Sequence, residues 1–380
     1  MNKILFIDSM SVMGGGQHQI VSLINGFRYR YPDIEIISVL SVNNDIFLDH
    51  LKKMNIKSYQ IHFGLNGYKN LLLKYYYSIN TMWSIYKKLK KICFSENPDI
   101  LYATDFKSAV YISLLKMRNI RKVYSIMSAR NHSSHRLLDR FILNKMDGLI
   151  FNSTYTYNSY KSVLNKSVQT LINYSIVEKP KNFLNKNNLI ELKDKLFNNQ
   201  SYLVGFVGRI VPIKRIEDFI EMVRLLNNEE LVISFIIIGE PDGHPKKDRY
   251  YLKLKKLIKH YKLSNISMIN YKKNIYDYIS IMDCLVLPTQ GEGFGRVVIE
   301  AIFSETPVVA TTPGGTDEIL KDGNNGVLVS QCEPNELAIG VRSILKKQFN
   351  PKNKIPTNMT VDSILKNEYN FLSNLLTAQC

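Results

Sequence analysis

Residues 285–302 read Leu-Val-Leu-Pro-Thr-Gln-Gly-Glu-Gly-Phe-Gly-Arg-Val-Val-Ile-Glu-Ala-Ile, the stretch around which the rest of the chain is organised. Its apolar beginning has the length of a buried parallel strand. Gly291, Gly293 and Gly295 predict a tight turn in which the backbone can approach a ligand closely. Residues 296–303 predict a helix after the turn. A helix that begins in this way directs free N–H groups and a partial positive charge at an anion.

Two carboxylates flank the turn. Glu292 lies in the turn, and Glu300 lies about one and a half turns into the helix, so both can face one crevice. A carboxylate can accept a hydrogen bond from each hydroxyl group of a vicinal diol, whereas the glycine turn suits a phosphate. An ordinary surface turn with two solvated glutamates is the alternative interpretation. Because the glycines, the glutamate spacing and the sequence of residues 300–310 occur together, a nucleotide-sugar site is favoured.

Glu292 and Glu300, with seven residues between them, resemble the donor-site signature of the retaining glycosyltransferases of family 4, within glycosyltransferase group 1. The resemblance is strong over residues 203–329 and moderate over the first 175 residues. It implies a GT-B fold, an α/β architecture in which two Rossmann-like domains with doubly wound parallel sheets face each other across a cleft.

The activity implied by this resemblance is transfer of a hexose-type sugar from a nucleotide diphosphate sugar, with retention of the anomeric configuration. The acceptor would be a glycan or a lipid-linked glycan in cell-surface polysaccharide synthesis. Enzymes of this kind generally work without a metal, and the sequence has no aspartate cluster suited to a divalent cation. We therefore expect no metal and no other cofactor.

A second loop supplies cations. A predicted buried strand ends at Gly208, and the loop after it carries Arg209 and Lys214. An arginine fork and a mobile lysine charge, five residues apart, suit a diphosphate. A solvated loop is the alternative, but the resemblance implies that the two cations clamp the donor diphosphate. The next strand, residues 232–238, ends at Gly239 in a turn that borders the nucleotide in relatives.

A glycine loop also follows the first predicted strand, residues 3–8, and leads into a helix. Such a corner suits a phosphate. Gln19 stands where the dinucleotide-binding fingerprint requires its third glycine, which disfavours a dinucleotide-dependent oxidoreductase. The resemblance implies that Gly15 and Gly16 place the backbone against the donor phosphates and the acceptor.

The resemblance also implies roles for the residues of the site. Arg209 and Lys214 would stabilise the departing diphosphate, Glu292 would hold the transferred hexose, and no protein nucleophile is required. The acceptor hydroxyl would give its proton to the departing phosphate oxygen. The residues expected to bind the donor are Gly15, Gly16, Gly208, Gly239, Gly293, Phe294, Gly295 and Glu300.

His132 is a further catalytic candidate. It follows a predicted strand, at the edge where open α/β sheets form their sites. Family members often carry a histidine near this strand end, but the local pattern does not distinguish His132 from His135. Arg130 in the same segment is a candidate for binding an acceptor phosphate.

The chain of 380 residues is long enough for two domains. We expect an acceptor-side domain at residues 1–174, a polar linker at 175–200 and the donor domain at 201–360. Residues 361–380 predict a helix that crosses back to the first domain, as in relatives. The chain begins with a strand rather than a signal peptide, and its four cysteines are scattered, so a cytoplasmic protein with reduced thiols is expected.

The net charge of +17 is concentrated in the first half: residues 1–173 hold 23 Lys and Arg against 10 Asp and Glu. This bias suits a nucleic acid, acidic lipid headgroups or a phosphorylated acceptor. Residues 68–93 predict a basic and aromatic helix, which would contact the inner face of a bacterial membrane or present a core-facing stripe with a solvated lysine face. A same-fold nucleotide-sugar epimerase and a basic nucleic-acid-binding protein are the alternative functions. The donor motif argues against a nucleic-acid partner.

Overall fold

The computed structural model divides the chain into two compact units. Unit 1 comprises residues 1–176 and 357–380, and unit 2 comprises residues 177–356. The structure describes residues 1–11, 13–42, 44–63, 71–117, 119–130, 136–180, 184–197, 201–227, 231–242, 245–323, 325–346, 352 and 354–377, apart from the side chains of residues 71–79 and 186. The chain enters unit 1 twice, since its last helix belongs to that unit.

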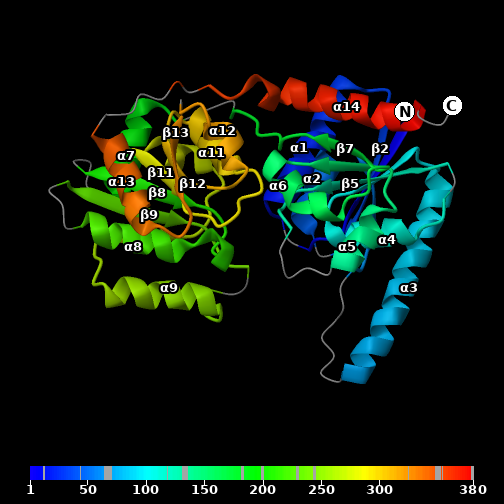
Figure 1. The fold of residues 1–380 in the computed structure, drawn as a ribbon, viewed down its shortest axis with the longest axis horizontal. Coiled ribbons are helices and arrows are strands. Elements are labelled where there is room, and N and C mark those ends of the chain that lie inside the picture. Colours follow the sequence, from blue (N-terminus) through cyan, green and yellow to red (C-terminus); the bar gives the residue numbers. More distant parts are fainter. Residues whose placement is uncertain are drawn as a thin grey trace. The chain divides into compact units, whose positions relative to one another are not determined.

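Unit 1 is built on a parallel sheet of seven strands in the order β3-β2-β1-β4-β5-β6-β7 (Figure 1). Its elements are β1 (Lys3–Asp8), α1 (Gly15–Arg30), β2 (Glu35–Ser41), α2 (Asp45–Lys53), β3 (Lys57–Ile61), α3 (Leu71–Glu96), β4 (Ile100–Ala103), α4 (Phe106–Leu114), β5 (Arg121–Ile126), α5 (Arg136–Leu143), β6 (Gly148–Phe151), α6 (Thr154–Tyr160), β7 (Gln169–Ile172) and α14 (Val361–Thr377). The strand order reverses between β1 and β4. The carboxyl ends of these two strands therefore mark the place where open α/β sheets bind ligands.

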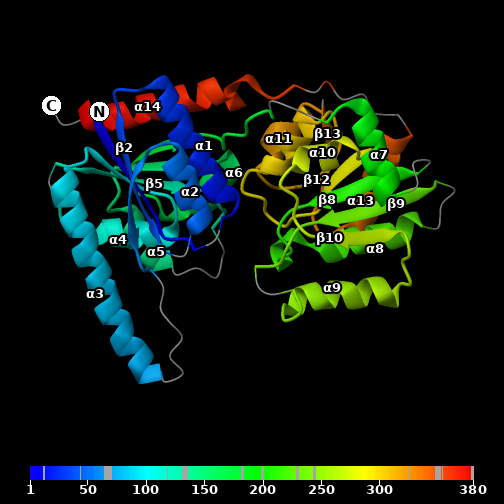
Figure 2. The same cartoon turned by 180° about the vertical axis from the view of Figure 1, so that it is seen from behind.

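Helices cover both faces of this sheet, as Figures 1 and 2 show. α3, α4 and α5 pack on one face, and α1, α2 and α14 pack on the other. Successive residues of β1 point to opposite faces, so that Leu5 and Ile7 join one core while Ile4 and Phe6 join the other. Burial on both faces explains why this strand has a continuous apolar sequence.

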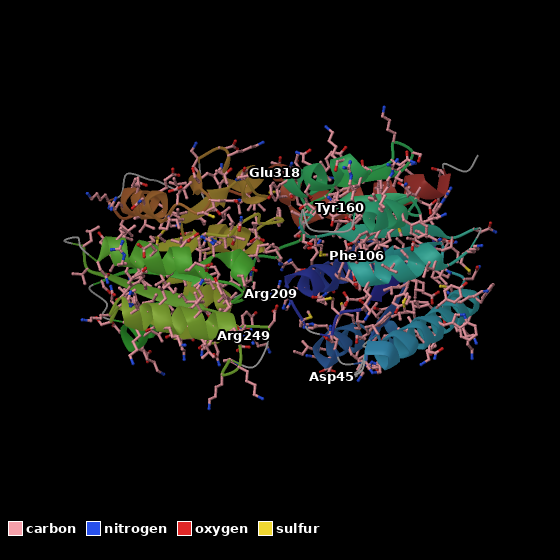
Figure 3. The ribbon with its side chains drawn as sticks, turned by 60° about the horizontal axis from the view of Figure 1, so that its bottom comes forward. Asp45, Phe106, Tyr160, Arg209, Arg249 and Glu318 are labelled. Atoms are coloured by element: carbon pink, nitrogen blue, oxygen red, sulfur yellow. The ribbon has the colours of Figure 1, made fainter. Side chains whose placement is uncertain are left out.

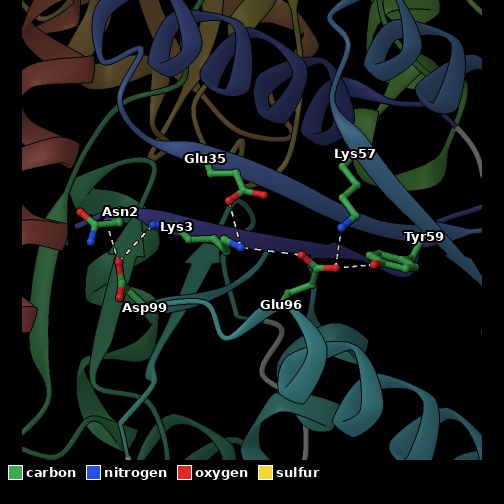
Figure 4. A network of polar contacts seen from close by, with 7 residues as sticks. All are labelled: Asn2, Lys3, Glu35, Lys57, Tyr59, Glu96 and Asp99. Carbon is green, nitrogen blue, oxygen red and sulfur yellow. Dashed lines mark hydrogen bonds and ion pairs between the residues drawn. The ribbon is translucent and has the colours of Figure 1, made fainter.

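A polar network closes the amino end of the sheet (Figure 4). Glu96, at the end of α3, accepts hydrogen bonds from Lys57 Nζ at 2.8 Å and from Tyr59 Oη. Lys3 Nζ lies 3.8 Å from the same carboxylate and 2.9 Å from Glu35. The hydrogen bonds from Lys57 and Tyr59 lower the pKa of Glu96. The network ties the first residues of β1, β2 and β3 to α3, at the edge opposite the carboxyl ends of the strands.

A buried carboxyl group holds α14 in unit 1. Glu368 accepts a hydrogen bond from Tyr102 Oη at 2.5 Å and another from Asn173 Nδ2 at 2.8 Å. The same Asn173 amide donates to the Ile364 carbonyl at 3.0 Å. Burial raises the pKa of Glu368 to about 7, although the two hydrogen bonds oppose the rise. The last helix is therefore anchored by a group that titrates near neutral pH.

Unit 2 has a parallel sheet of six strands in the order β10-β9-β8-β11-β12-β13. Its elements are α7 (Lys186–Leu196), β8 (Tyr202–Val207), α8 (Ile216–Leu226), β9 (Ile233–Ile238), α9 (Arg249–His260), β10 (Ile266–Ile269), α10 (Ile275–Ser280), β11 (Cys284–Leu287), α11 (Arg296–Phe303), β12 (Val308–Thr312), α12 (Thr316–Leu320), β13 (Gly326–Ser330) and α13 (Pro334–Leu345). α13 packs on α8 and on the three strands from β11 to β13, and α9 packs on α8 from outside (Figure 1). No helix in the described part of the chain is long and apolar enough to cross a membrane.

Candidate functional site

The strand order of unit 2 reverses between β8 and β11, so the loops after these two strands share one edge of the sheet. The loop after β8 carries Arg209 and ends in a short turn, Pro212–Lys214. The loop after β11 carries Glu292 and leads into α11. Gln290 N donates to the Ile213 carbonyl at 2.9 Å and joins the two loops. The topology thus brings together two segments that lie far apart in the sequence.

Lys214 and Glu292 form an ion pair between these loops. Lys214 Nζ lies 2.5 Å from Glu292 Oε2, and each side chain is 18% exposed. Salt screens a half-buried pair of this kind much less than a surface pair. The lysine of the predicted diphosphate clamp and the glutamate of the predicted hexose site therefore lie in direct contact.

Arg209 has a different carboxylate partner. Arg209 Nη1 donates to Asp242 Oδ1 at 3.0 Å and to Oδ2 at 3.3 Å. Both side chains are 61% exposed, and Arg209 is labelled in Figure 3. An ion pair as exposed as this one contributes little free energy, so an incoming anion can displace it readily. Asp242 was not among the predicted site residues, and the signal for it was its place in the turn after β9.

The glycine turn has the conformation that its sequence requires. Gly291 and Gly295 have φ values of 74° and 91°, in the left-handed region, and Gly295 directly precedes α11. A second backbone segment supports the turn: Gly315 N donates to the Glu292 carbonyl at 2.8 Å. A Cβ on Gly315 would lie 2.2 Å from the Gly293 carbonyl oxygen, which no real structure tolerates. Sequence reasoning missed this supporting role of Gly315.

Glu300 lies half-buried on α11, one helix turn after Arg296. Burial raises the pKa of Glu300, and the Arg296 charge opposes the rise. Burial also raises the pKa values of Tyr271 and Tyr276, and the Glu300 carboxylate adds to both shifts. The carboxylate is thus coupled electrostatically to two phenols and a guanidinium. A group of this chemistry can accept hydroxyl hydrogen bonds at the edge of the site.

Gly208 and Gly239 lie at the ends of β8 and β9. A Cβ on Gly239 would lie 1.8 Å from the Gly208 carbonyl oxygen. Because Gly239 has no side chain, the ends of β8 and β9 can approach each other closely. This contact gives the glycine a structural reason, while its expected contact with the donor stays a prediction.

In unit 1, Gly15 and Gly16 form the start of α1, and a buried carboxylate supports the loop before them. Gly14 N donates to Gln17 Oε1 at 3.2 Å, and Gln17 Nε2 donates to Asp8 Oδ2 at 3.2 Å. Burial, together with the neighbouring Asp105 carboxylate, raises the pKa of Asp8 to about 6. Asp8 was not predicted to support this loop. A charged residue directly after a buried apolar run was the available signal.

The acceptor-side candidates have different outcomes. His132 and His135 lie outside the described residues. Arg130 Nε donates to Asp139 Oδ2 at 2.7 Å, and both side chains are less than 10% exposed. A buried carboxylate thus holds Arg130 in the structure, and its expected contact with an acceptor phosphate stays a prediction. Among the described residues, no group of three or more His, Cys, Asp or Glu side chains could hold a metal ion.

Residues 188–360 match the family model of glycosyl transferases group 1. An uncharacterised glycosyltransferase of Methanocaldococcus jannaschii is 28% identical over 294 residues, which cover 74% of this chain and 77% of that protein. The capsular polysaccharide biosynthesis glycosyltransferase CapM of Staphylococcus aureus is 26% identical over 163 residues, or 43% of this chain and 41% of CapM. The chain thus spans most of the first relative and less than half of the second.

HepE of Anabaena, solved in complex with UDP and glucose, has the same fold. The TM-score is 0.79 at 19% sequence identity, over 98% of this chain and 100% of HepE. Similarity at this level of identity shows the fold, which is GT-B, with a parallel sheet in each of two α/β units. Together, these findings show that the chain has a GT-B fold, that residues 188–360 match glycosyl transferases of group 1, and that its relatives include glycosyltransferases.

Proposed function

We propose that this chain is a retaining glycosyltransferase of family 4, which transfers a hexose from a nucleotide diphosphate sugar to a glycan or lipid-linked acceptor. The observation that carries the proposal is the meeting of Lys214 with Glu292 at the carboxyl ends of β8 and β11. Arg209 lies in the same loop as the lysine, and the N-terminus of α11 follows the glutamate. A cation pair and a helix N-terminus suit a diphosphate, and the glutamate beside them suits a sugar.

In this proposal, charge stabilisation supplies most of the rate. Departure of the nucleoside diphosphate builds negative charge, which Arg209, Lys214 and the N–H groups at the start of α11 stabilise. Glu300 accepts the ribose hydroxyls, and Glu292 with the N–H groups of the glycine turn holds the hexose. The acceptor hydroxyl attacks from the face that the diphosphate leaves and gives its proton to the departing phosphate oxygen. No protein nucleophile and no metal take part.

The names of similar proteins guide the choice of substrates. HepE was solved with UDP and glucose, and CapM is named for capsular polysaccharide synthesis. UDP-hexoses are therefore the first donors to test, with GDP- and ADP-hexoses beside them. The proposed acceptor is a growing surface glycan, free or on a lipid carrier.

Transfer assays with this donor panel test the proposal. Lys214→Ala should lower turnover by about a hundredfold or more, because it removes a charge that acts mainly in the transition state. Lys256→Ala is the matched control, since it removes an exposed lysine from α9. Equal loss in both variants, or no loss in either, contradicts the proposed clamp. Donor consumption without acceptor would instead indicate the epimerase, and retention on nucleic acid at physiological salt would indicate the nucleic-acid-binding alternative.

We also propose peripheral contact of unit 1 with the anionic inner face of the cell membrane. α3, α4 and α5 lie side by side on one face of unit 1 (Figures 1 and 2). Their outer surface exposes large apolar side chains, including Trp83 at 60%, Phe94 at 65%, Leu137 at 84% and Phe141 at 51%. Lys87 Nζ lies 3.3 Å from the Trp83 ring centre. Aromatic and cationic groups together suit the interface of acidic lipids.

Co-sedimentation with lipid vesicles tests this contact. The chain should bind vesicles that contain phosphatidylglycerol at low salt, and Leu137→Asp should weaken that binding. Vesicles of phosphatidylcholine alone are the control. No sedimentation with anionic vesicles at low salt would contradict the membrane contact and leave the transferase proposal unaffected.

A further inference from the structure

Lys214 and Glu292 have separate tasks in the proposed function, yet in the structure each satisfies the other. Their charged atoms lie 2.5 Å apart, and each side chain is only 18% exposed. The Arg209–Asp242 pair, whose arginine lies in the same loop as Lys214, has side chains that are 61% exposed and is weak by comparison. A diphosphate therefore meets one cation that is readily available and one that an internal carboxylate already neutralises.

The backbone around the pair is fixed on both sides. Gln290 N donates to the Ile213 carbonyl at 2.9 Å, which ties the lysine loop to the glutamate loop. Gly315 N donates to the carbonyl of Glu292 itself at 2.8 Å. A change of partner must therefore come from rotation of the two side chains, with their loops in place. Lysine, with four rotatable methylene groups, can turn from a carboxylate to a neighbouring phosphate.

We infer that Glu292 is a specificity-determining residue, which makes the site prefer the nucleotide sugar to the nucleoside diphosphate that remains after transfer; this inference rests on the proposed function. With the sugar present, its hydroxyl groups donate to the Glu292 carboxylate, and Lys214 turns to the diphosphate. With the sugar gone, the carboxylate competes with the diphosphate for the same lysine. The leaving product is therefore held less tightly than the donor, and no covalent bond changes in this exchange.

Calorimetric titration with UDP, GDP and ADP as probes tests the inference. Glu292→Gln keeps the shape of the side chain and removes the competing charge. The nucleoside diphosphate that binds the wild type should bind this variant about tenfold tighter, the scale of one charge-assisted hydrogen bond. Turnover of the matching nucleotide sugar should fall at the same time. Unchanged or weaker binding of the diphosphate to Glu292→Gln overturns the inference.

Two further variants separate the exchange from simple charge repulsion. Glu333→Gln removes an equal charge from an exposed residue whose side chain makes no capping hydrogen bond, and it should leave the affinity unchanged. In a Lys214→Met background, Glu292→Gln should no longer tighten binding, because the lysine to be released is gone. Equal tightening with and without the lysine would overturn the exchange.

The same titrations distinguish failure of the inference from failure of the function. A wild-type chain that binds none of the three diphosphates and none of their hexose derivatives contradicts the proposed function as a whole. A wild type that binds one of them, without tightening in Glu292→Gln, contradicts only the role of Glu292. Thermal unfolding of each variant near the wild-type midpoint shows that the comparison is made on folded protein.

Discussion

Gly315→Ala is the substitution that most directly tests the support of the glycine turn. Gly315 has φ −64° and ψ −18°, which alanine adopts without strain, so the effect of the added methyl group is purely steric. Its Cβ would lie 2.2 Å from the Gly293 carbonyl oxygen and 2.7 Å from the Phe294 Cα, both backbone atoms. The two segments must separate by roughly 1 Å to reach ordinary contact.

Such a shift has two expected costs. Overpacking lowers the free energy of unfolding by about 1–3 kcal/mol. A displacement of about 1 Å at the residues that hold the donor lowers kcat/KM by roughly a hundredfold. Steady-state transfer assays with the preferred donor measure the second effect, and thermal unfolding measures the first.

Gly340→Ala is the matched control. Gly340 lies in α13, and its Cβ would meet two side chains, Val309 at 3.0 Å and Val329 at 3.6 Å, and no backbone atom among its three nearest contacts. This variant should lose about 1 kcal/mol of stability or less and keep its activity. Wild-type kcat/KM in Gly315→Ala would show that the packed backbone at Gly315 does not hold the turn in its active position.

Two further predictions concern unit 1, and fluorescence of Trp83, the only tryptophan, reports on its denaturant unfolding. In the folded chain the pKa of Glu368 is about 7, against an ordinary 4.5. Its contribution to the free energy of unfolding is therefore fully present below pH 4.5 and is lost as the pH rises through 7. The total loss is roughly 3 kcal/mol. Glu368→Gln should flatten the fall in stability between pH 5 and 8, and an unchanged pH profile would contradict this role. Glu96→Gln should lower the free energy of unfolding by about 1–3 kcal/mol at pH 7 and leave turnover unchanged, because it weakens charged hydrogen bonds remote from the site. Since those hydrogen bonds lower the pKa of Glu96, the stability advantage of the wild type should disappear as the pH falls. A stability advantage that persists in acid would contradict this role of Glu96.

The strands were predictable where both faces are buried. The strand predicted at residues 3–8 is confirmed with the same bounds as β1, and the strand predicted at residues 232–238 is confirmed as β9, which begins one residue later. β7, Gln169–Ile172, was missed because it is short, begins with two exposed polar residues and lies at the edge of the sheet. Edge strands lack the continuous apolar run that marks a central strand.

The members of the candidate site could be named from their motifs, but their pairing could not. Lys214 and Glu292 lie 78 residues apart, and only the adjacency of β8 and β11 brings them together. Asp242 and Gly315 act on the site through loops whose sequence gives no sign of a partner. Asp8 supports the first glycine loop through two linked hydrogen bonds, from Gly14 to Gln17 and from Gln17 to Asp8, which form only once this loop and the start of α1 are folded.

The proposed function depends on the binding of a sugar diphosphate by Arg209 and Lys214, in the loop after β8. Calorimetric titration of UDP-, GDP- and ADP-hexoses into the wild type and into an Arg209→Ala, Lys214→Ala double variant tests it most directly. We expect saturable binding of one donor class to the wild type and loss of about a hundredfold or more in affinity in the double variant. Equal affinity in the two proteins, or no binding of any donor to the wild type, would contradict it.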